Sequence, residues 1–340
     1  MTIDCRDMLE QLLKGEHLTE DQAFELMCAL AEDDMAPAQA GALLAALRAK
    51  GETPDEIRGF ALGMRKLARK PQLPAGLDAA DCVGTGGDGS GSLNISTGTS
   101  ILAAACGVPM IKHGNRSVSS KSGSADALEC LGINIAEDAD SAIEGLTQNN
   151  FAFLFAPGFH PAMKNIMPVR VAMGVRTVFN ILGPLTNPAE PPYHLIGAFS
   201  LGMAEIMANA LAGMNLKRAF VVHGEPGWDE ASPVGVFDLF DVTPGSVKHE
   251  RRDPQDYGIP RCLPEDLAGG DADENAAALA AVMNDEDQGA HADALVLGAG
   301  LLLEVTGRAA DLNAGIAQAR EAIASGAAKQ QLASLRYTPA

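Results

Sequence analysis

The sequence predicts an α/β protein with a small N-terminal helical domain and a large α/β domain built on a mainly parallel central sheet. Three observations lead to this fold class. Capped helical patterns fill the first 70 residues, short apolar strands then alternate with helices, and glycine-rich loops follow two of those strands. A chain of 340 residues is long enough for one large core with a smaller satellite.

Residues 6–70 carry the signals of four helices. A capping box runs from Thr19 to Gln22, and the segment Thr53–Glu56 combines an N-cap, a proline at the first helical position and a capping glutamate. Gly51 marks a helix end, and apolar residues recur at helical spacing before it, within 24–28 and within 43–47. The proline- and glycine-containing stretch 70–77 is the expected linker.

Strand and helix patterns alternate after this linker. We expect strands at 80–83, 108–111 and 151–155, and helices at 97–106, 124–131 and 139–148. Short connections between alternating elements indicate a parallel sheet with helices on both faces. The two glycine-rich loops then lie at the carboxyl ends of strands, where such sheets bind ligands.

The second half of the chain continues the pattern with one interruption. Residues 161–174 are expected to be helical, and Gly183-Pro184 and Asn187-Pro188 then break regular structure. We expect further strands at 193–199, 218–223 and 236–242, a helix at 201–214, a polar and poorly patterned stretch at 245–262, and helical stretches at 274–284, 291–305 and 311–335.

The first glycine-rich loop extends from Gly84 to Gly91 and leads into a helix. Glycines let backbone N–H groups point into one concavity, and a following helix N-terminus adds unpaired donors and a positive dipole end. We expect Asn94, Ser96 and Thr97 at cap positions, where their side chains can bind phosphate oxygens or a metal-held water. The Walker motif and the dinucleotide fingerprint are both absent, so the loop is an anion cradle of another kind.

The second loop, 112–126, holds three fixed cations, one histidine and five serines. A surface charge run is usually mixed in sign and lacks paired glycines. The net charge of the chain is −19, which argues against a nucleic-acid partner, since such partners require basic stripes. An anionic substrate must therefore be held by a local positive pocket, which we expect between Lys112 and Lys121.

Cysteine usage and hydropathy indicate the compartment. The six cysteines show no CxxC spacing and most lie in apolar surroundings, so we expect reduced core thiols and no zinc site. The N-terminus lacks the regions of a signal peptide, and no apolar run approaches the roughly 20 residues that a membrane span requires. A cytoplasmic protein without a membrane partner is expected.

The motifs, taken in order, resemble a known family. Gly84-Thr-Gly-Gly-Asp88, Asn94-Ile-Ser-Thr-Gly-Thr-Ser100 and the segment 112–129 resemble the phosphoribosyl-pyrophosphate site of the anthranilate phosphoribosyltransferases. The segment 160–188 resembles the anthranilate side of that family, and 223–233 resembles its acidic metal motif. The resemblance covers most of the chain, and the combined motifs are far more specific than one glycine loop.

The resemblance implies how the domains are arranged. In the family, the segment corresponding to 161–188 packs onto the helical domain, here 1–72, so that the chain crosses between domains twice. Residues 73–160 and 189–340 would form the phosphoribosyl-pyrophosphate-binding α/β domain, with the active site in the cleft between the two domains. A homodimer through the helical domains is also implied.

The reaction implied is transfer of the 5-phosphoribosyl group from its pyrophosphate donor to the amino group of anthranilate, in tryptophan biosynthesis. Magnesium would neutralise the pyrophosphate leaving group. Asp229 and Glu230 are adjacent hard oxygen ligands, which suit a magnesium ion that keeps several waters. By family analogy Ser96 helps to hold a second ion, so two Mg²⁺ are expected.

The resemblance also assigns the substrate contacts. The donor contacts are Gly84, Thr85, Gly87, Asp88, Asn94, Ser96, Thr97, Lys112 and Ser124, and the anthranilate contacts are Gly84, His113, Asn115 and Arg170. Lys112 would pair with phosphate as a mobile point charge, and Arg170 would bind the anthranilate carboxylate through its planar fork. Arg176 is the alternative: it is either that arginine or part of a structural ion pair.

Two other functions are weighed against this one. Pyrimidine nucleoside phosphorylases share the two-domain plan but use inorganic phosphate, and the acidic metal pair argues against them. A non-enzymatic relative that binds nucleic acid is disfavoured by the acidity of the chain. Two departures from the family pattern, at Ala231 and in the segment 297–300, leave the proposed site intact.

Overall fold

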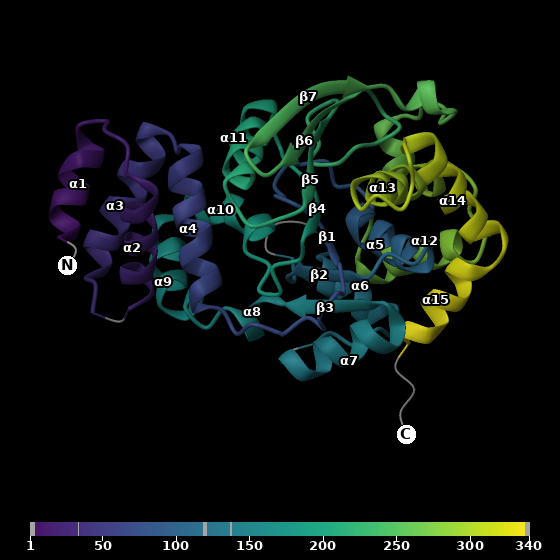
Figure 1. The fold of residues 1–340 in the computed structure, drawn as a ribbon, viewed down its shortest axis with the longest axis horizontal. Helices are drawn as coiled ribbons and strands as arrows, with labels where there is room; N and C mark the ends of the chain where they lie inside the picture. Colours follow the sequence, from purple (N-terminus) through teal and green to yellow (C-terminus); the bar gives the residue numbers. More distant parts are fainter. Residues whose placement is uncertain (1–3, 33, 118–120, 137, 337–340) are drawn as a thin grey trace.

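The computed structural model describes residues 4–32, 34–117, 121–136 and 138–336. Val118, Ser119 and Ser120 of the second loop, and Met1–Ile3 of the N-terminal stretch, lie outside the described residues. A helical bundle forms one end of the molecule, and a seven-stranded sheet covered by helices forms the rest (Figure 1). The predicted fold class is confirmed.

Four helices make up the N-terminal part of the bundle, as predicted: α1 (Cys5–Leu13), α2 (Glu20–Ala31), α3 (Pro37–Lys50) and α4 (Pro54–Leu67). Both capping boxes are present, at Thr19 and at Thr53. Glu56, which completes the second box, is fully buried and also accepts hydrogen bonds from Lys50 Nζ and from the Leu18 N–H, each at 2.8 Å. One buried carboxylate therefore ties the start of α4 to the end of α3 and to the turn before α2.

The strands are β1 (Ala80–Gly84), β2 (Met110–Gly114), β3 (Phe151–Phe155), β4 (Tyr193–Gly197), β5 (Arg218–Gly224), β6 (Phe237–Thr243) and β7 (Ser246–Arg252). Their order in the sheet is β3-β2-β1-β4-β5-β6-β7. The first five pair in parallel, β6 pairs antiparallel with β5, and β7 pairs antiparallel with β6. Strand β7 falls in the stretch predicted to be irregular, because it is an exposed edge strand without an apolar alternation.

The helices of the α/β part are α5 (Ile95–Ala105), α6 (Ser124–Cys130), α7 (Ala139–Asn149), α8 (Ala156–Phe159), α11 (Leu201–Ala212), α12 (Ala272–Met283), α13 (Ala290–Val305), α14 (Leu312–Ala324) and α15 (Ala327–Leu335). The expected single stretch at 311–335 is two helices. Gly326 separates them, with a φ of 81° that is typical of glycine at a helix break. In the described part of the chain, short 3₁₀ turns lie at Gly183–Leu185, Pro254–Tyr257 and Pro264–Leu267.

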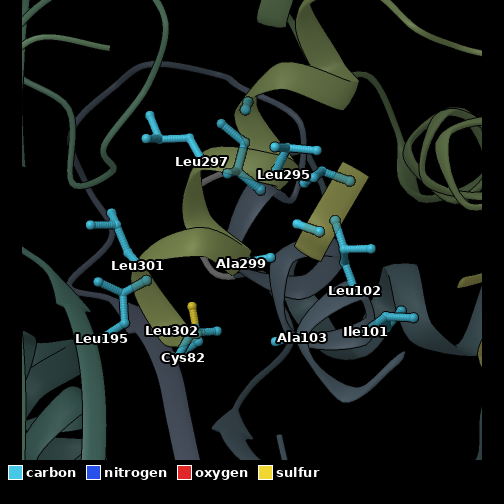
Figure 2. Packing of buried hydrophobic residues seen from close by; sticks show 14 of the residues in the cluster. Cys82, Ile101, Leu102, Ala103, Leu195, Leu295, Leu297, Ala299, Leu301 and Leu302 are labelled. Atoms are coloured by element: carbon cyan, nitrogen blue, oxygen red, sulfur yellow. The ribbon is translucent and has the colours of Figure 1, made fainter. Parts of the chain in front are cut away.

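Helix α13 packs on one face of the sheet and against α5. Leu301 and Leu302 lie beside Leu195 of β4 and Cys82 of β1 (Figure 2). Gly298 faces α5 so closely that a Cβ atom there would overlap the side chain of Thr99. The departure from the family pattern at 297–300 therefore lies in a helix–helix crossing, where a small residue lets the two backbones approach.

The other face of the sheet is covered by α11, whose core continues into the bundle through α4. The segment after β3 also joins this core: α9 (Met163–Met173) packs against α2 and α3, and α10 (Phe179–Leu182) packs against α4. Asn165 Nδ2 donates to the Ala31 carbonyl at 2.8 Å, and the buried Arg65 Nε donates to the Leu185 carbonyl at 2.8 Å. Polar bonds as well as apolar contacts hold this segment against the bundle.

The cysteines form no disulfide, and the expectation of core thiols is wrong for the exposed Cys130, whereas Cys5, Cys106 and Cys262 pack against the core clusters. Cys82 is buried, Cys130 is exposed, and the other four are partly exposed. Apolar neighbours in sequence do not place a residue on the buried face of a helix, which is why the pattern misled. Among the described residues, no helix has the length and apolar character needed to cross a membrane.

Candidate active site

The strand order reverses between β1 and β4. The chain adds β2 and β3 on one side of β1 and then returns to add β4 and β5 on the other side. Gly84 and Gly197, the last residues of β1 and β4, are paired at this point. Open α/β sheets bind ligands in the crevice at such a switch point, so the topology places a site at these two glycines.

The glycine-rich loop starts here and is fixed to β4. The Thr85 N–H donates to the Gly197 carbonyl at 3.0 Å, and Thr85 Oγ1 accepts from the Phe199 N–H at 3.2 Å. Gly86 and Gly87 then take φ angles of 70° and 74°, which L side chains rarely adopt. Two successive glycines with positive φ let the backbone turn sharply just beyond the end of β1.

The acidic pair lies directly against these strand ends. Asp229 Oδ2 accepts from the Gly86 N–H at 2.6 Å, and the Asp229 N–H donates to Asp88 Oδ2 at 3.3 Å. A Cβ atom on Gly84 would overlap the Asp229 carboxylate, and one on Gly197 would overlap its backbone carbonyl. Glycine is therefore needed at both strand ends so that the acidic segment can approach the sheet.

Electrostatics at the pair favour a bound cation. Burial, followed by the charge of Asp88, raises the pKa of Asp229, and burial, followed by the charge of Asp229, raises the pKa of Glu230. No described lysine or arginine forms an ion pair with either carboxylate, although the charge of Lys112 favours ionised Glu230. A divalent ion would compensate this crowded negative charge.

The donor set fits magnesium. Two adjacent carboxylates supply hard oxygen ligands, and Glu230 also accepts a hydrogen bond from the Ser96 backbone, which places it at the N-terminus of α5. Among the described residues, no group of three histidine, cysteine or acidic side chains is arranged to hold a metal by itself. Mg²⁺ commonly takes one or two carboxylates and completes its shell with water and substrate phosphate.

Lys112 differs from the expectation of a mobile charge in a loop. It belongs to strand β2 and is 1% exposed, and its ammonium donates to the Cys82 carbonyl and, at 3.1 Å, to Ser96 Oγ. The strand extends three residues beyond the predicted end because Lys112 and His113 pair with Phe153 and Leu154 of β3. Its charge is fixed beneath the loop, next to the hydroxyl at the start of α5.

Helix α5 begins at Ile95, two residues earlier than expected. Asn94 is its N-cap residue but makes no capping hydrogen bond, and Ser96 and Thr97 lie in the first turn. The Asn94 side chain instead contacts the second loop, accepting from Ser122 Oγ at 3.1 Å. Thr97 is fully buried, and its hydroxyl has no partner among the described residues, so it is the least accessible residue of the predicted donor set.

The second loop is less positive than the sequence suggested. Arg116 forms ion pairs with Asp126 and Glu129, at 3.1 and 2.5 Å, so most of its charge is compensated. The expected positive pocket between Lys112 and Lys121 is therefore reduced. Ser124, the first residue of α6, donates through Oγ to the Asn115 carbonyl at 3.2 Å. This bond places a predicted contact of phosphoribosyl pyrophosphate beside a predicted contact of anthranilate.

His113 is a buried, neutral side chain. Burial, followed by the neighbouring His160, lowers the pKa of His113 to about 3, and the two rings lie 5.0 Å apart between centroids. The ring also bonds to the Gly183 backbone, and its Nε2 has no partner among the described residues. The imidazole therefore joins β2 to the segment that crosses to the bundle.

The two candidate arginines differ in their contacts. Arg170 is partly buried on α9, its guanidinium lies 5.4 Å from the Phe179 ring centroid, and it forms no ion pair with any described residue. Arg176 also forms no such ion pair. Its Nη2 donates to the Gly87 carbonyl at 2.5 Å, and its own carbonyl accepts from Arg48. The structural ion pair considered for Arg176 is therefore wrong for the described part of the chain.

Sequence reasoning missed residues that support the site from a distance. Gly197 lay inside the predicted strand 193–199 and carried no signal of its own, and Asn275 had only one: an asparagine in the first turn of a well-capped helix. Asn275 is 3% exposed and donates to Asn94 Oδ1 at 2.8 Å. Contacts between residues 181 positions apart are invisible in a single sequence.

Comparison with known proteins decides the family. Residues 76–329 match the model described as glycosyl transferase family, a/b domain, and residues 6–68 match the helical bundle domain of the same family. An anthranilate phosphoribosyltransferase of Rhodopseudomonas palustris (strain HaA2) is 43% identical over 333 residues, which are 98% of each chain. The chain belongs to the anthranilate phosphoribosyltransferase family.

Solved anthranilate phosphoribosyltransferases share the whole fold. The structure from Thermus thermophilus is 41% identical with a TM-score of 0.90, and the match covers 97% of this chain and 100% of that one. The Saccharomyces cerevisiae structure in complex with PRPP and Mg is 25% identical, with a TM-score of 0.88 and coverage of 98% and 96%. The predictions of the family, the fold and a phosphoribosyl-transferring enzyme are confirmed, which argues against the nucleoside phosphorylase and nucleic-acid-binding alternatives.

Proposed function

We propose that this protein uses Mg²⁺ to transfer the 5-phosphoribosyl group from phosphoribosyl pyrophosphate to the amino group of anthranilate, forming N-(5-phosphoribosyl)anthranilate and pyrophosphate. The observation that carries the proposal is the adjacent Asp229–Glu230 pair, which forms no ion pair with a described lysine or arginine and whose buried Asp229 packs against a glycine-rich loop at the switch point of the sheet. The full-length identity to anthranilate phosphoribosyltransferases supports it.

The donor site comprises the glycine-rich loop, the start of α5 and the end of β2. Its contacts are Gly84, Thr85, Gly87, Asp88, Asn94, Ser96, Thr97, Lys112 and Ser124. Backbone N–H groups of the loop and the N-terminus of α5 bind phosphate oxygens, because both present unpaired donors to an anion. Lys112 donates a hydrogen bond that holds the Ser96 hydroxyl in place, and it adds a fixed positive charge next to that hydroxyl.

Two magnesium ions are proposed, one held by Asp229 and Glu230 and one by Ser96 on the donor's pyrophosphate. When bound, magnesium neutralises charge that develops on the leaving pyrophosphate. The hydrogen bond from Gly86 to Asp229 orients that carboxylate, and the Ser96 backbone bond orients Glu230. The chain thus presents both carboxylates in fixed positions before any ion arrives.

The acceptor site is formed by Gly84, His113, Asn115 and Arg170. Arg170 has no carboxylate partner among the described residues, so its planar fork is available to the carboxylate of anthranilate. An arylamine has a free lone pair at neutral pH, and the neutral His113 matches a site that needs no strong general base. Catalysis then comes from positioning and electrostatics.

The proposal includes the division of the chain into two domains. Residues 1–72 with 161–188 form the helical domain, 73–160 with 189–340 form the donor-binding domain, and substrates meet between them. A homodimer through the helical domains is proposed because large apolar side chains are exposed there, among them Leu13, Met167 and Val171. A cytoplasmic location is proposed because all six cysteines are free.

The two arginines give a test of the acceptor site. We expect Arg170→Met to raise the KM for anthranilate about tenfold or more, because it removes a bidentate contact to the carboxylate, while the KM for the donor stays within about twofold. Steady-state kinetics with each substrate varied in turn measure both values.

Arg176→Met is the matched control, since it removes the same kind of side chain from the same segment. Arg176 contacts the glycine-rich loop, so this variant is expected to change the donor KM and leave the anthranilate KM nearly unchanged. If Arg176→Met raised the anthranilate KM and Arg170→Met did not, the acceptor role would belong to Arg176.

A further inference from the structure

Asn275 connects the C-terminal helices to the donor site. It lies in the first turn of α12, is almost fully buried, and uses both ends of its amide. Its Oδ1 accepts from the Gly270 N–H at 2.7 Å, and its Nδ2 donates to Asn94 Oδ1 at 2.8 Å. Asn94 belongs to the proposed donor site. It lies 181 positions before Asn275 in the sequence, and the fold brings the two residues into contact.

These bonds determine which way both amides face. A backbone N–H can only donate, so the Asn275 atom that faces Gly270 must be its oxygen. Its NH₂ group then faces Asn94, and the Asn94 atom that meets it must be the oxygen. The orientation of the Asn94 side chain is therefore set by a backbone group on another part of the chain.

Ser122 supports the same orientation. Its hydroxyl donates to Asn94 Oδ1 at 3.1 Å, and its carbonyl accepts from Asn94 Nδ2 at 3.3 Å. Asn94 Oδ1 thus accepts two hydrogen bonds, whereas only one N–H of its Nδ2 has a described acceptor. The second N–H is left to donate to another group.

The segment that leads into α12 is held against the end of the glycine-rich loop and the residues that follow it. The Leu93 N–H donates to the Leu267 carbonyl at 2.9 Å, and the Gly269 N–H donates to the Gly91 carbonyl at 2.8 Å. A Cβ atom on Gly269 would lie 2.5 Å from the Ser92 carbonyl oxygen, so the two backbones are in close contact. Asn275 therefore has a fixed position relative to Asn94.

We propose that Asn275 is a positioning residue that keeps the Asn94 amide turned so that an N–H, and not the carbonyl oxygen, faces the oxygens of the phosphoribosyl donor. This inference rests on the donor role proposed for Asn94. An N–H stabilises an anionic or hydroxyl oxygen of the donor, whereas the reversed amide would place a carbonyl oxygen against it. Asn275 acts through Asn94 and does not touch the substrate.

The test replaces Asn275 by Asp, which keeps the size and the acceptor for Gly270 but turns the facing NH₂ into an oxygen. Asn94 can then bond to residue 275 only by rotating its amide and giving up its two bonds with Ser122, and the rotated amide presents Oδ1 to the donor. We expect the KM for phosphoribosyl pyrophosphate to rise about tenfold, with the anthranilate KM and the melting temperature close to wild type.

Asn275→Ala separates this role from simple packing. Without Asn275, only Ser122 holds the Asn94 amide, so its orientation is less well fixed and the donor KM is expected to rise about threefold, less than in Asn275→Asp. A merely structural role predicts the reverse order, because alanine leaves a cavity and an unpaired Gly270 N–H while aspartate does not. That reverse order overturns the proposal.

Asn94→Ala distinguishes failure of the inference from failure of the donor site. We expect it to raise the donor KM, and we expect Asn275→Asp to add nothing in that background, since interacting residues give non-additive effects. Additive effects overturn the inference alone, while an Asn94→Ala variant with an unchanged donor KM overturns the donor role of Asn94 and the inference with it. Asn284→Asp, the same charge change at the other end of α12, is the control and should leave both KM values unchanged.

Discussion

The double variant Asp229→Asn/Glu230→Gln is expected to lose about a thousandfold in kcat, roughly 4 kcal/mol of transition-state stabilisation. The amides keep the shape of the pair and can still accept from Gly86 and from the Ser96 backbone. They cannot offer anionic oxygens to magnesium, so the charge of the departing pyrophosphate is left without that compensation. Initial rates at saturating substrates and magnesium measure the loss.

The fold of this variant should be unaffected. Burial raises the pKa of both carboxyl groups, and charge repulsion adds to it, from Asp88 at Asp229 and from Asp229 at Glu230, so the ionised pair is unfavourable in the folded protein without a cation. Neutral amides remove that repulsion, so the melting temperature without magnesium should equal or exceed that of wild type. Magnesium should raise the melting temperature of wild type with donor present, and should raise it less in the variant.

A second acidic dipeptide provides the control. Asp285 and Glu286 are exposed at the turn after α12, and Asp285→Asn/Glu286→Gln makes the same change of charge there. Its kcat should stay within about twofold of wild type, as for surface changes in general. Equal losses in the two double variants, or full activity in the first, would show that Asp229 and Glu230 do not hold the catalytic metal.

The second large effect is expected for Gly197→Ala, which should lower kcat about a hundredfold, because a displacement of about 1 Å near a reacting centre has effects of this size. The added methyl group overlaps the Asp229 carbonyl, which must move away from the sheet. Gly197 is not one of the proposed substrate contacts. A loss of kcat in this variant would therefore come from displacement of the acidic segment that contains Asp229. Initial-rate assays with purified, folded protein measure it.

Gly202→Ala is the matched control for this change. Gly202 lies in the first turn of α11 with no atom near its added Cβ, so alanine should be tolerated and should leave kcat unchanged. A melting temperature lowered by a few degrees is expected for Gly197→Ala from overpacking alone. Wild-type kcat in Gly197→Ala would contradict the argument that Asp229 must sit against the end of β4.

Local signals predicted much of the fold. The capping boxes at Thr19 and Thr53 located two helix starts, because caps are satisfied by residues three positions away. The apolar run at 151–155 gave β3 within its bounds, since it is buried on both faces. Strand β7 was missed because an exposed edge strand needs no apolar face, and Lys112 was placed in a loop because its pairing partner lies on β3.

The sequence predicted which residues belong to the candidate site, but not the contacts that hold them in place. The sequence motifs indicated the loop, the acidic pair and the arginines, because each is recognised from residues that are close together in the sequence. Three features depend on contacts between distant segments: the close approach of Asp229 to Gly197, the contact of Arg176 with Gly87, and the bond from Asn275 to Asn94. A single sequence contains no record of such pairings.

Anthranilate fluorescence provides the most direct test of the central claim, which is magnesium-dependent phosphoribosyl transfer to anthranilate. Purified protein is added to anthranilate and phosphoribosyl pyrophosphate, with and without magnesium, and the fluorescence of anthranilate is followed in time. We predict a loss of fluorescence with magnesium, equal in moles to the pyrophosphate released, and no loss without it. Unchanged fluorescence with magnesium, in a protein that still binds the donor, would mean that the acceptor is another amine or base.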